Sequence, residues 1–258
     1  MIEGGATARD HFVAKWLARE PEMRFVEPFC PAPARERFLA WGALLHELRE
    51  TVFELSDPGV ARAKAGWWAE TLLAITAGES RHPLVAPMPA DAPWRALARA
   101  LVALAAEAPR VSSTEEALAN LLVPAEAASR VEAAVFGGAS TQDAAQSLAV
   151  HWLLHRLPRG LADDDQARIP MHLLARHGLS AAELPTARSR ALLRDWGSEL
   201  FAAMPAALPQ AVLFRRARHR LDRVRLRALA RTGEPRPAAP PTALWQAWHA
   251  AREASRAG

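Results

Sequence analysis

The sequence predicts an all-α fold in a single domain, and three observations support this prediction. Apolar residues recur at helical spacing along most of the chain, while the alternating pattern of a β-strand is absent. Proline, glycine and aspartate interrupt this pattern at intervals that suit helices of ordinary length. The chain has 258 residues, 50% hydrophobic and 23% charged, which lies in the globular range. With no repeat of solenoid length, we expect one domain over residues 1–258.

The rest of the chain is organised around residues 41–72. A first helix is predicted by apolar residues at helical spacing, namely Phe38, Trp41, Leu44, Leu45, Leu48 and Val52. The sequence Asp57-Pro58-Gly59 interrupts the pattern, and a second helix follows. On this second helix an aromatic and aliphatic face is predicted from Trp67, Trp68, Leu72 and Ile75.

Further helices are predicted on both sides of this pair. They span residues 8–20, 94–107, 114–122, 125–136, 141–157, 171–177, 186–204, 209–231 and 242–254. Residues 112–116 offer an N-cap followed by early acidic residues, and Gly137 and Gly178 are predicted helix ends. Residues 235–241 form a proline-rich linker before the terminal helix.

Composition limits the class of protein and its partners. The formal net charge is only +4, and 30 of the 32 basic residues are arginine, the exceptions being Lys15 and Lys64. This modest charge gives no support for nucleic-acid binding. The single cysteine, Cys30, excludes an internal disulfide and suggests a buried thiol in a reducing cytosol. With no stretch of 18 apolar residues, we expect a cytoplasmic protein, with peripheral contact at the inner membrane as an alternative.

Common catalytic motifs are absent from the sequence. There is no Gly-x-Ser-x-Gly elbow, phosphate-binding glycine-rich loop or dinucleotide-binding fingerprint, so hydrolase, NTPase and dehydrogenase functions lack support. His151 and His155 have the i, i+4 spacing of a zinc pair, but Trp152 occupies the position of the usual glutamate and no third ligand is evident. We therefore expect these histidines to serve in helix packing or capping.

Several of these segments together resemble the squalene/phytoene synthase family. The resemblance lies in the acidic helix, the break, the pattern Arg-x-x-x-x-Trp-Trp-x-Glu from Arg62 to Glu70, and the pair His82-Pro83. It extends over residues 9–252 and is closest to a divergent branch whose first aspartate-rich motif is similar to Glu47-Leu48-Arg49-Glu50. That branch includes assembly proteins of mitochondrial respiratory complex I. The resemblance implies an isoprenoid-synthase-like helical bundle around a central cavity.

The resemblance also implies which residues would act in an active member. Such members bind Mg²⁺ with two facing Asp-x-x-x-Asp motifs, because departing diphosphate needs its charge neutralised and Mg²⁺ prefers oxygen ligands. Glu47 and Glu50 would then be catalytic residues and metal ligands, with Asp163 as a further ligand. Arg49 and Arg156 would bind the substrate. The alternative for Glu47 and Glu50 is a surface acidic face paired with Arg49 or Arg62.

The second acidic motif is the main departure from the family pattern. An ungapped alignment places Leu157 and Leu161 where the two aspartates are expected. The nearby run Asp163 to Asp165 would point its carboxylates in different directions, so a solvated acidic loop is the favoured interpretation.

Three functions remain open. The first is a squalene/phytoene synthase-like protein, non-catalytic, with a lipid-binding or assembly role and no cofactor. The second is an active Mg²⁺-dependent prenyltransferase that joins two prenyl diphosphates head to head. The third is a helical interaction module, in which the arginine-rich helix at 213–231 contacts a membrane or a protein partner.

Overall fold

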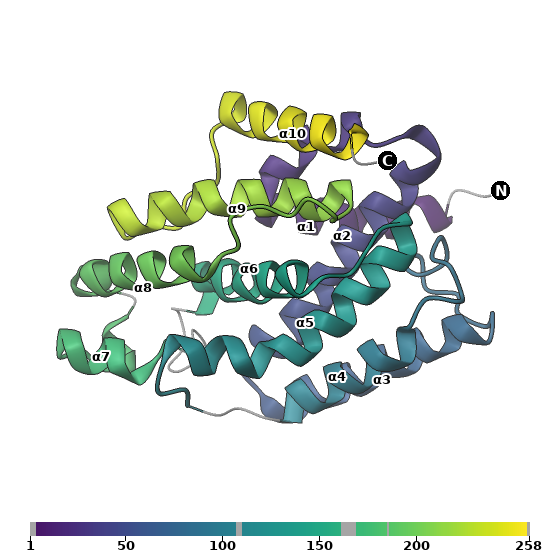
Figure 1. Ribbon diagram of the computed structural model, residues 1–258. Helices are drawn as coiled ribbons and strands as arrows, with labels where there is room; N and C mark the ends of the chain where they lie inside the picture. The colour runs from purple at the N-terminus through teal and green to yellow at the C-terminus, as the bar shows by residue number, and fades with distance from the viewer. Residues whose placement is uncertain (1–3, 107–109, 161–168, 185, 257–258) are drawn as a thin grey trace.

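The computed structural model describes residues 4–106, 110–160, 169–184 and 186–256, and every regular element among them is helical (Figure 1). The α-helices are α1 (Gly4–Arg19), α2 (Ala32–Phe53), α3 (Pro58–Thr76), α4 (Trp94–Ala106), α5 (Thr114–Phe136), α6 (Gln142–Gly160), α7 (Met171–His177), α8 (Arg190–Ala203), α9 (Leu213–Thr232) and α10 (Pro240–Ser255). Short 3₁₀ helices are η1 (Pro21–Phe25), η2 (Glu27–Phe29), η3 (Ala181–Glu183) and η4 (Ala187–Ser189). The predicted all-α fold is confirmed.

Helix α2 forms the centre of the bundle. It contacts α1, α3, α4, α5 and α6, and 15 of its residues are buried. The α3–α4 pair covers one side, while α8, α9 and α10 form the other, with α9 between its two neighbours (Figure 1). Side chains that α2 and α9 direct inward therefore meet in the interior.

The break between α2 and α3 lies at the predicted position, and the structure shows how α3 begins there. Asp57 is the N-cap of α3, and its carboxylate accepts hydrogen bonds from the amides of Gly59 (2.6 Å) and Val60 (3.1 Å). The predicted aromatic face is only partly correct, because Trp68 is 1% exposed whereas Trp67 is 48% exposed. Neighbouring helical residues point about 100° apart, and because α3 lies at one side of the bundle, the direction of Trp68 is covered and that of Trp67 is not.

The predicted break near residue 123 is wrong. Residues Thr114–Phe136 form one continuous helix, α5, with Pro124 inside it. Proline lacks the amide hydrogen that would bond to the carbonyl of Asn120, which normally breaks a helix. Here Pro124 is itself buried, and apolar burial of its neighbours Leu121 and Ala125 offsets that cost.

Other local predictions agree with the structure. Ser113 caps α5 by accepting a hydrogen bond from the Glu116 amide (3.2 Å), and Gly137 ends the helix at φ 71°. Helix α7 has the predicted limits, and Cys30 is a buried free thiol. None of the described helices combines the length and apolar character needed to cross a bilayer.

Gly42 allows α1 and α2 to pack closely. A Cβ atom at this position would lie 2.3 Å from the buried ring of Trp16, which cannot move without disturbing the core. We expect Gly42→Ala to lower the free energy of unfolding by about 1–3 kcal/mol, as measured by urea denaturation. The matched change Gly66→Ala on α3 meets no atom within 4 Å and should instead stabilise by roughly 0.5–1 kcal/mol. Equal effects at the two sites would contradict this account.

Candidate functional site

The two acidic residues of the first motif lie together on the inner side of α2. Glu47 is 3% exposed and Glu50 is 8% exposed. Lys15 on α1 donates to Glu47 at 2.7 Å and also to Glu50, and the ammonium of Lys64 on α3 lies 3.6 Å from both carboxylates. These are the only two lysines in the sequence, so both of them converge on one acidic pair.

The pKa shifts of Glu50 and Lys15 both favour the charged forms, which pair with each other. Burial raises the pKa of Glu50, but the hydrogen bond and charge of Lys15 outweigh burial and leave the pKa below its ordinary value. For Lys15, burial by itself lowers the pKa, but the hydrogen bonds and charges of Glu47 and Glu50 outweigh burial and leave the pKa above its ordinary value. Two carboxylates then face two ammonium groups, with no net negative charge to attract Mg²⁺. As they stand, the described residues here do not fit a magnesium site.

Arg49 turns away from the acidic pair that flanks it in sequence. Its guanidinium donates to Glu20 at 2.8 Å, lies 2.9 Å from Nδ1 of His46, and is 3.7 Å from Glu54. Burial, reinforced by the Arg49 charge, lowers the pKa of His46 to about 3. The second predicted substrate-binding residue, Arg156, is fully buried, with its guanidinium 5.7 Å from the ring centre of Phe53.

The second motif is only partly described. Leu157, at the first position where the sequence comparison expected an aspartate, is completely buried in the apolar core. Leu161 and Asp163 to Asp165 lie outside the described residues. The predicted role of Asp163 therefore stays a prediction.

Beside the predicted site, a buried ionic network joins η1, α2, α6 and α9. Its acidic members are Glu20, Glu22 and Asp222, each no more than 2% exposed. Arg218 contacts all three, with N–O distances of 2.9 Å to Glu20, 2.8 Å to Glu22 and 3.0 Å to Asp222. Arg225 adds a second contact to Glu22 at 2.8 Å.

The two predicted packing histidines belong to this network. His151 Nδ1 lies 2.9 Å from Asp222, and His155 Nε2 lies 2.7 Å from the same carboxylate. Burial is the largest influence on both imidazoles and lowers the pKa of each. Glu20 could complete a three-ligand metal group with them, since the ligand atoms lie within 4.8 Å. However, Arg49 and Arg218 already bind Glu20, so this group is better described as an internal ion-pair network.

Sequence reasoning did not identify Glu20, Glu22 or Asp222. The one available signal was Asp222 itself, the only acidic residue among the arginines of α9 and four residues after Arg218. Four arginines of this helix are buried and so are not available for the surface contact that the third hypothesis assigns to it. The buried ones are Arg215, Arg218 and Arg225, at most 3% exposed, and Arg216, 6% exposed. They are buried because α6, α8 and α10 surround the helix.

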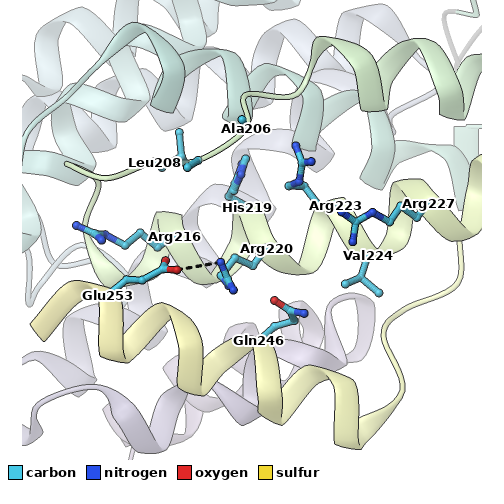
Figure 2. Close-up of a pocket in the computed structure, with 11 residues that line it drawn as sticks. Ala206, Leu208, Arg216, His219, Arg220, Arg223, Val224, Arg227, Gln246 and Glu253 are labelled. Carbon is cyan, nitrogen blue, oxygen red and sulfur yellow. Dashed lines mark hydrogen bonds and ion pairs between the residues drawn. The ribbon is translucent and has the colours of Figure 1, made fainter. Parts of the chain in front are cut away.

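Little open space remains between the helices α2, α4, α5 and α6. A void there, lined by Leu48, Arg49, Phe53, Leu101 and Trp152 among others, has a volume of about 20 Å³. That is room for about one water molecule. Three larger hollows among the described residues open at the surface instead. They are an apolar groove of about 750 Å³ between α3 and α4, a pocket of about 630 Å³ where the start of α2, the end of α5 and the start of α9 meet, and an arginine-lined pocket of about 290 Å³ between α9 and α10 (Figure 2).

Comparisons with known proteins support the fold. No protein-family model and no curated protein sequence matches this chain. Among solved structures, the crystal structure of squalene synthase HpnC from Alicyclobacillus acidocaldarius is similar, with a TM-score of 0.50 and 15% identity. The match covers 100% of this chain and 94% of that chain. The chain thus has an all-helical squalene synthase-like fold, and at this identity the similarity establishes the fold alone.

Proposed function

We propose that this chain is a squalene/phytoene synthase-like protein that has lost metal-dependent condensation and serves in lipid binding or assembly. The observation that carries the proposal is the pairing of Glu47 and Glu50 with Lys15 and Lys64. A diphosphate-binding metal centre needs an excess of negative oxygen ligands. The lysines remove that excess at the position where an active member would hold Mg²⁺.

The small volume of the void beside Arg49 supports the same proposal. Sites for small ligands usually have volumes of about 300–1,000 Å³. The void beside Arg49 measures about 20 Å³, so a prenyl chain could enter there only if the helices moved apart.

The groove between α3 and α4 is the proposed lipid site. Its lining includes Leu73 and Val102, which are 39% and 45% exposed, and Arg95 and Arg99 stand beside them on α4. An apolar floor with neighbouring guanidinium groups suits a prenyl or acyl chain that ends in an acidic group. Its volume of about 750 Å³ falls in the usual range for such ligands.

The first test is an assay for condensation. Purified protein is incubated with farnesyl or geranylgeranyl diphosphate, Mg²⁺ and a reduced nicotinamide, and released diphosphate and extracted hydrocarbon are measured. We expect neither product, because the acidic pair is neutralised. Catalytic diphosphate release, abolished by Glu47→Gln, would instead establish the active head-to-head prenyltransferase.

Replacing the lysines tests the reason for inactivity. In Lys15→Gln/Lys64→Gln the two carboxylates lose their cations, so Mg²⁺ should raise the melting temperature of this variant and not that of the wild-type protein. Arg62→Gln/Arg99→Gln is the control for charge, because it removes two positive charges from exposed helix positions and leaves both lysines in place. Mg²⁺ should not stabilise this control. Mg²⁺ stabilisation of the wild-type protein would contradict the proposed block.

Lipid binding is tested with farnesol, which has the prenyl chain without the diphosphate. We expect binding that is weakened about tenfold by Val102→Asp, since a charge in an apolar contact must be desolvated. Val123→Asp is the matched control, because Val123 is 70% exposed on α5 and does not line the groove. Equal affinity in both variants would remove the groove from the proposal.

A further inference from the structure

The pocket between α9 and α10 is built around four arginines on one side of α9. Arg216, Arg220, Arg223 and Arg227 are spaced at i, i+4, i+7 and i+11, so they follow one face of the helix. Figure 2 shows their side chains around a hollow that α10 and the segment before α9 complete. Its volume is about 290 Å³.

The charges in this pocket are poorly balanced. Glu253 is the one acidic residue in the described lining, and it lies 3.1 Å from Arg220 (Figure 2). His219 also lines the pocket, but burial lowers its pKa to about 4, so it is neutral at pH 7. Four guanidinium groups against one carboxylate leave a formal charge of +3.

The arginines are held in place by backbone groups more than by acids. Arg216 is 6% exposed and donates to the carbonyls of Ala211, at 2.5 Å, and Pro209. Arg223 donates to the carbonyl of Pro205 at 2.9 Å, and its guanidinium lies 4.6 Å from the ring centre of Phe201. These contacts orient the guanidinium groups without neutralising them.

Some guanidinium groups of the pocket keep unused hydrogen-bond donors, and two of them repel each other. Nε of Arg220 is buried and has no hydrogen-bond partner among the described residues. Arg227 makes no hydrogen bond or ion pair to a described residue, and its guanidinium lies 5.2 Å from the ring centre of Phe201. Burial lowers the pKa of Arg223, and repulsion by Arg227 lowers it further. An anion in the hollow would relieve both the repulsion and the missing hydrogen bonds.

We propose that this pocket binds a phosphate monoester or diphosphate group. Such a group carries about −1.5 charge or more at pH 7 and offers several acceptor oxygens, whereas a single carboxylate carries only −1. Guanidinium groups bind phosphate oxygens in a planar, two-bond geometry, which suits a lining of arginine. The proposal concerns the outer face of α9 and does not depend on whether the interior is catalytic.

Two sources could supply this group, a soluble phosphorylated molecule or a lipid headgroup. The neighbouring helix α10 exposes Trp245 (57%) and Trp248 (38%), and the Arg252 guanidinium lies 5.2 Å from the Trp248 ring. Tryptophan and arginine side chains of this kind suit a membrane interface. The experiment therefore needs one arm for each source.

The soluble arm measures pyrophosphate and inorganic phosphate binding to the full chain by isothermal titration calorimetry, with acetate as the carboxylate control. We expect pyrophosphate to bind more tightly than acetate, and Arg223→Gln/Arg227→Gln to weaken it at least about tenfold. Arg62→Gln on α3 removes the same kind of charge outside the pocket and should leave affinity unchanged. Arg227→Gln alone keeps all described hydrogen bonds and loses only the guanidinium contact with the Phe201 ring, so an unchanged melting temperature in this variant would separate weakened binding from unfolding.

The lipid arm uses sedimentation with phosphatidylcholine vesicles that contain either phosphatidic acid or phosphatidylglycerol. Preferential binding to phosphatidic acid, lost in Arg223→Gln/Arg227→Gln, would identify a lipid headgroup as the source. Pyrophosphate binding without that preference would identify a soluble ligand. Absence of binding in both arms, or the same affinity in the pocket variants and Arg62→Gln, would overturn the proposal.

Discussion

Replacing Arg218 with methionine should lower the free energy of unfolding by about 3–5 kcal/mol at pH 7. Arg218 is 1% exposed and is the one described cation that contacts Glu20, Glu22 and Asp222 together. Removing one member of a buried ionic group leaves carboxylates that have already lost their hydration. Methionine fills much of the same volume as arginine, so the decrease in the free energy of unfolding would come mainly from the lost charge and less from lost packing. Urea denaturation followed by circular dichroism provides the measurement.

Arg220→Met, two residues along the same helix, is the matched control. The Arg220 side chain is 27% exposed and its partner Glu253 is 45% exposed, so solvent screens their ion pair. We expect a loss of no more than about 1 kcal/mol. A loss from Arg218→Met as small as that from Arg220→Met would mean that water reaches the interior network.

Acidification from pH 6.5 to pH 5 should lower the free energy of unfolding by about 3 kcal/mol. Burial lowers the pKa of His46 to about 3 and that of His219 to about 4, whereas an unfolded histidine titrates near about 6.5. Below that value the unfolded chain binds protons that the folded chain excludes, so stability falls as pH falls. Each histidine contributes half of the full slope of about 1.4 kcal/mol per pH unit at pH 6.5, where the unfolded group is half protonated, and most of it by pH 5. Two histidines therefore give about 3 kcal/mol over this range. The lowered pKa values of His151 and His155 act in the same direction.

The carboxylates add to this dependence at lower pH. Burial by itself would raise the pKa values of Glu20 and Asp222, but both lie well below their ordinary values. The charge of Arg218 outweighs burial at both carboxylates, helped by the charge of Arg49 at Glu20 and by a hydrogen bond from His151 at Asp222. Their contribution is therefore complete above about pH 4.5 and is lost only as the pH falls further.

Urea denaturation at several pH values between 5 and 7.5 measures the histidine effect. In His219→Gln the mean slope of stability against pH between 6.5 and 5 should decrease by about 1 kcal/mol per unit, because one group fewer takes up a proton on unfolding. Stability that stays constant from pH 7 to pH 5 would contradict the burial of neutral histidines.

The helices and several of their ends could be predicted because they depend on nearby residues. Asp57 reaches amides only two and three residues away, and Gly137 ends α5 through its own backbone conformation. Pro124 shows the limit of such reasoning, since its local cost was outweighed by burial against other helices. Trp67 shows the same limit, because its spacing alone did not tell on which side of α3 the core would lie.

The candidate site was predicted less completely than the fold. Spacing placed Glu47 and Glu50 on one face of α2, and the structure keeps them together. Their partner Lys15 is 32 residues from Glu47 in sequence, however, and no local pattern connects the two. Whether an acidic pair can take a metal depends on which charges other helices bring to it.

Residue patterns alone predicted an all-α chain, its main helices, several helix ends, and a resemblance to a family whose fold the structure shares. The packing of distant helices was needed to bring the two lysines to the acidic pair, to place Arg218 and Asp222 in the interior, and to set Arg223 and Arg227 at a pocket. The two kinds of feature differ in the range of the interactions that produce them. Helices and caps depend on hydrogen bonds between residues a few positions apart, whereas the charge and burial of a site depend on how distant helices pack.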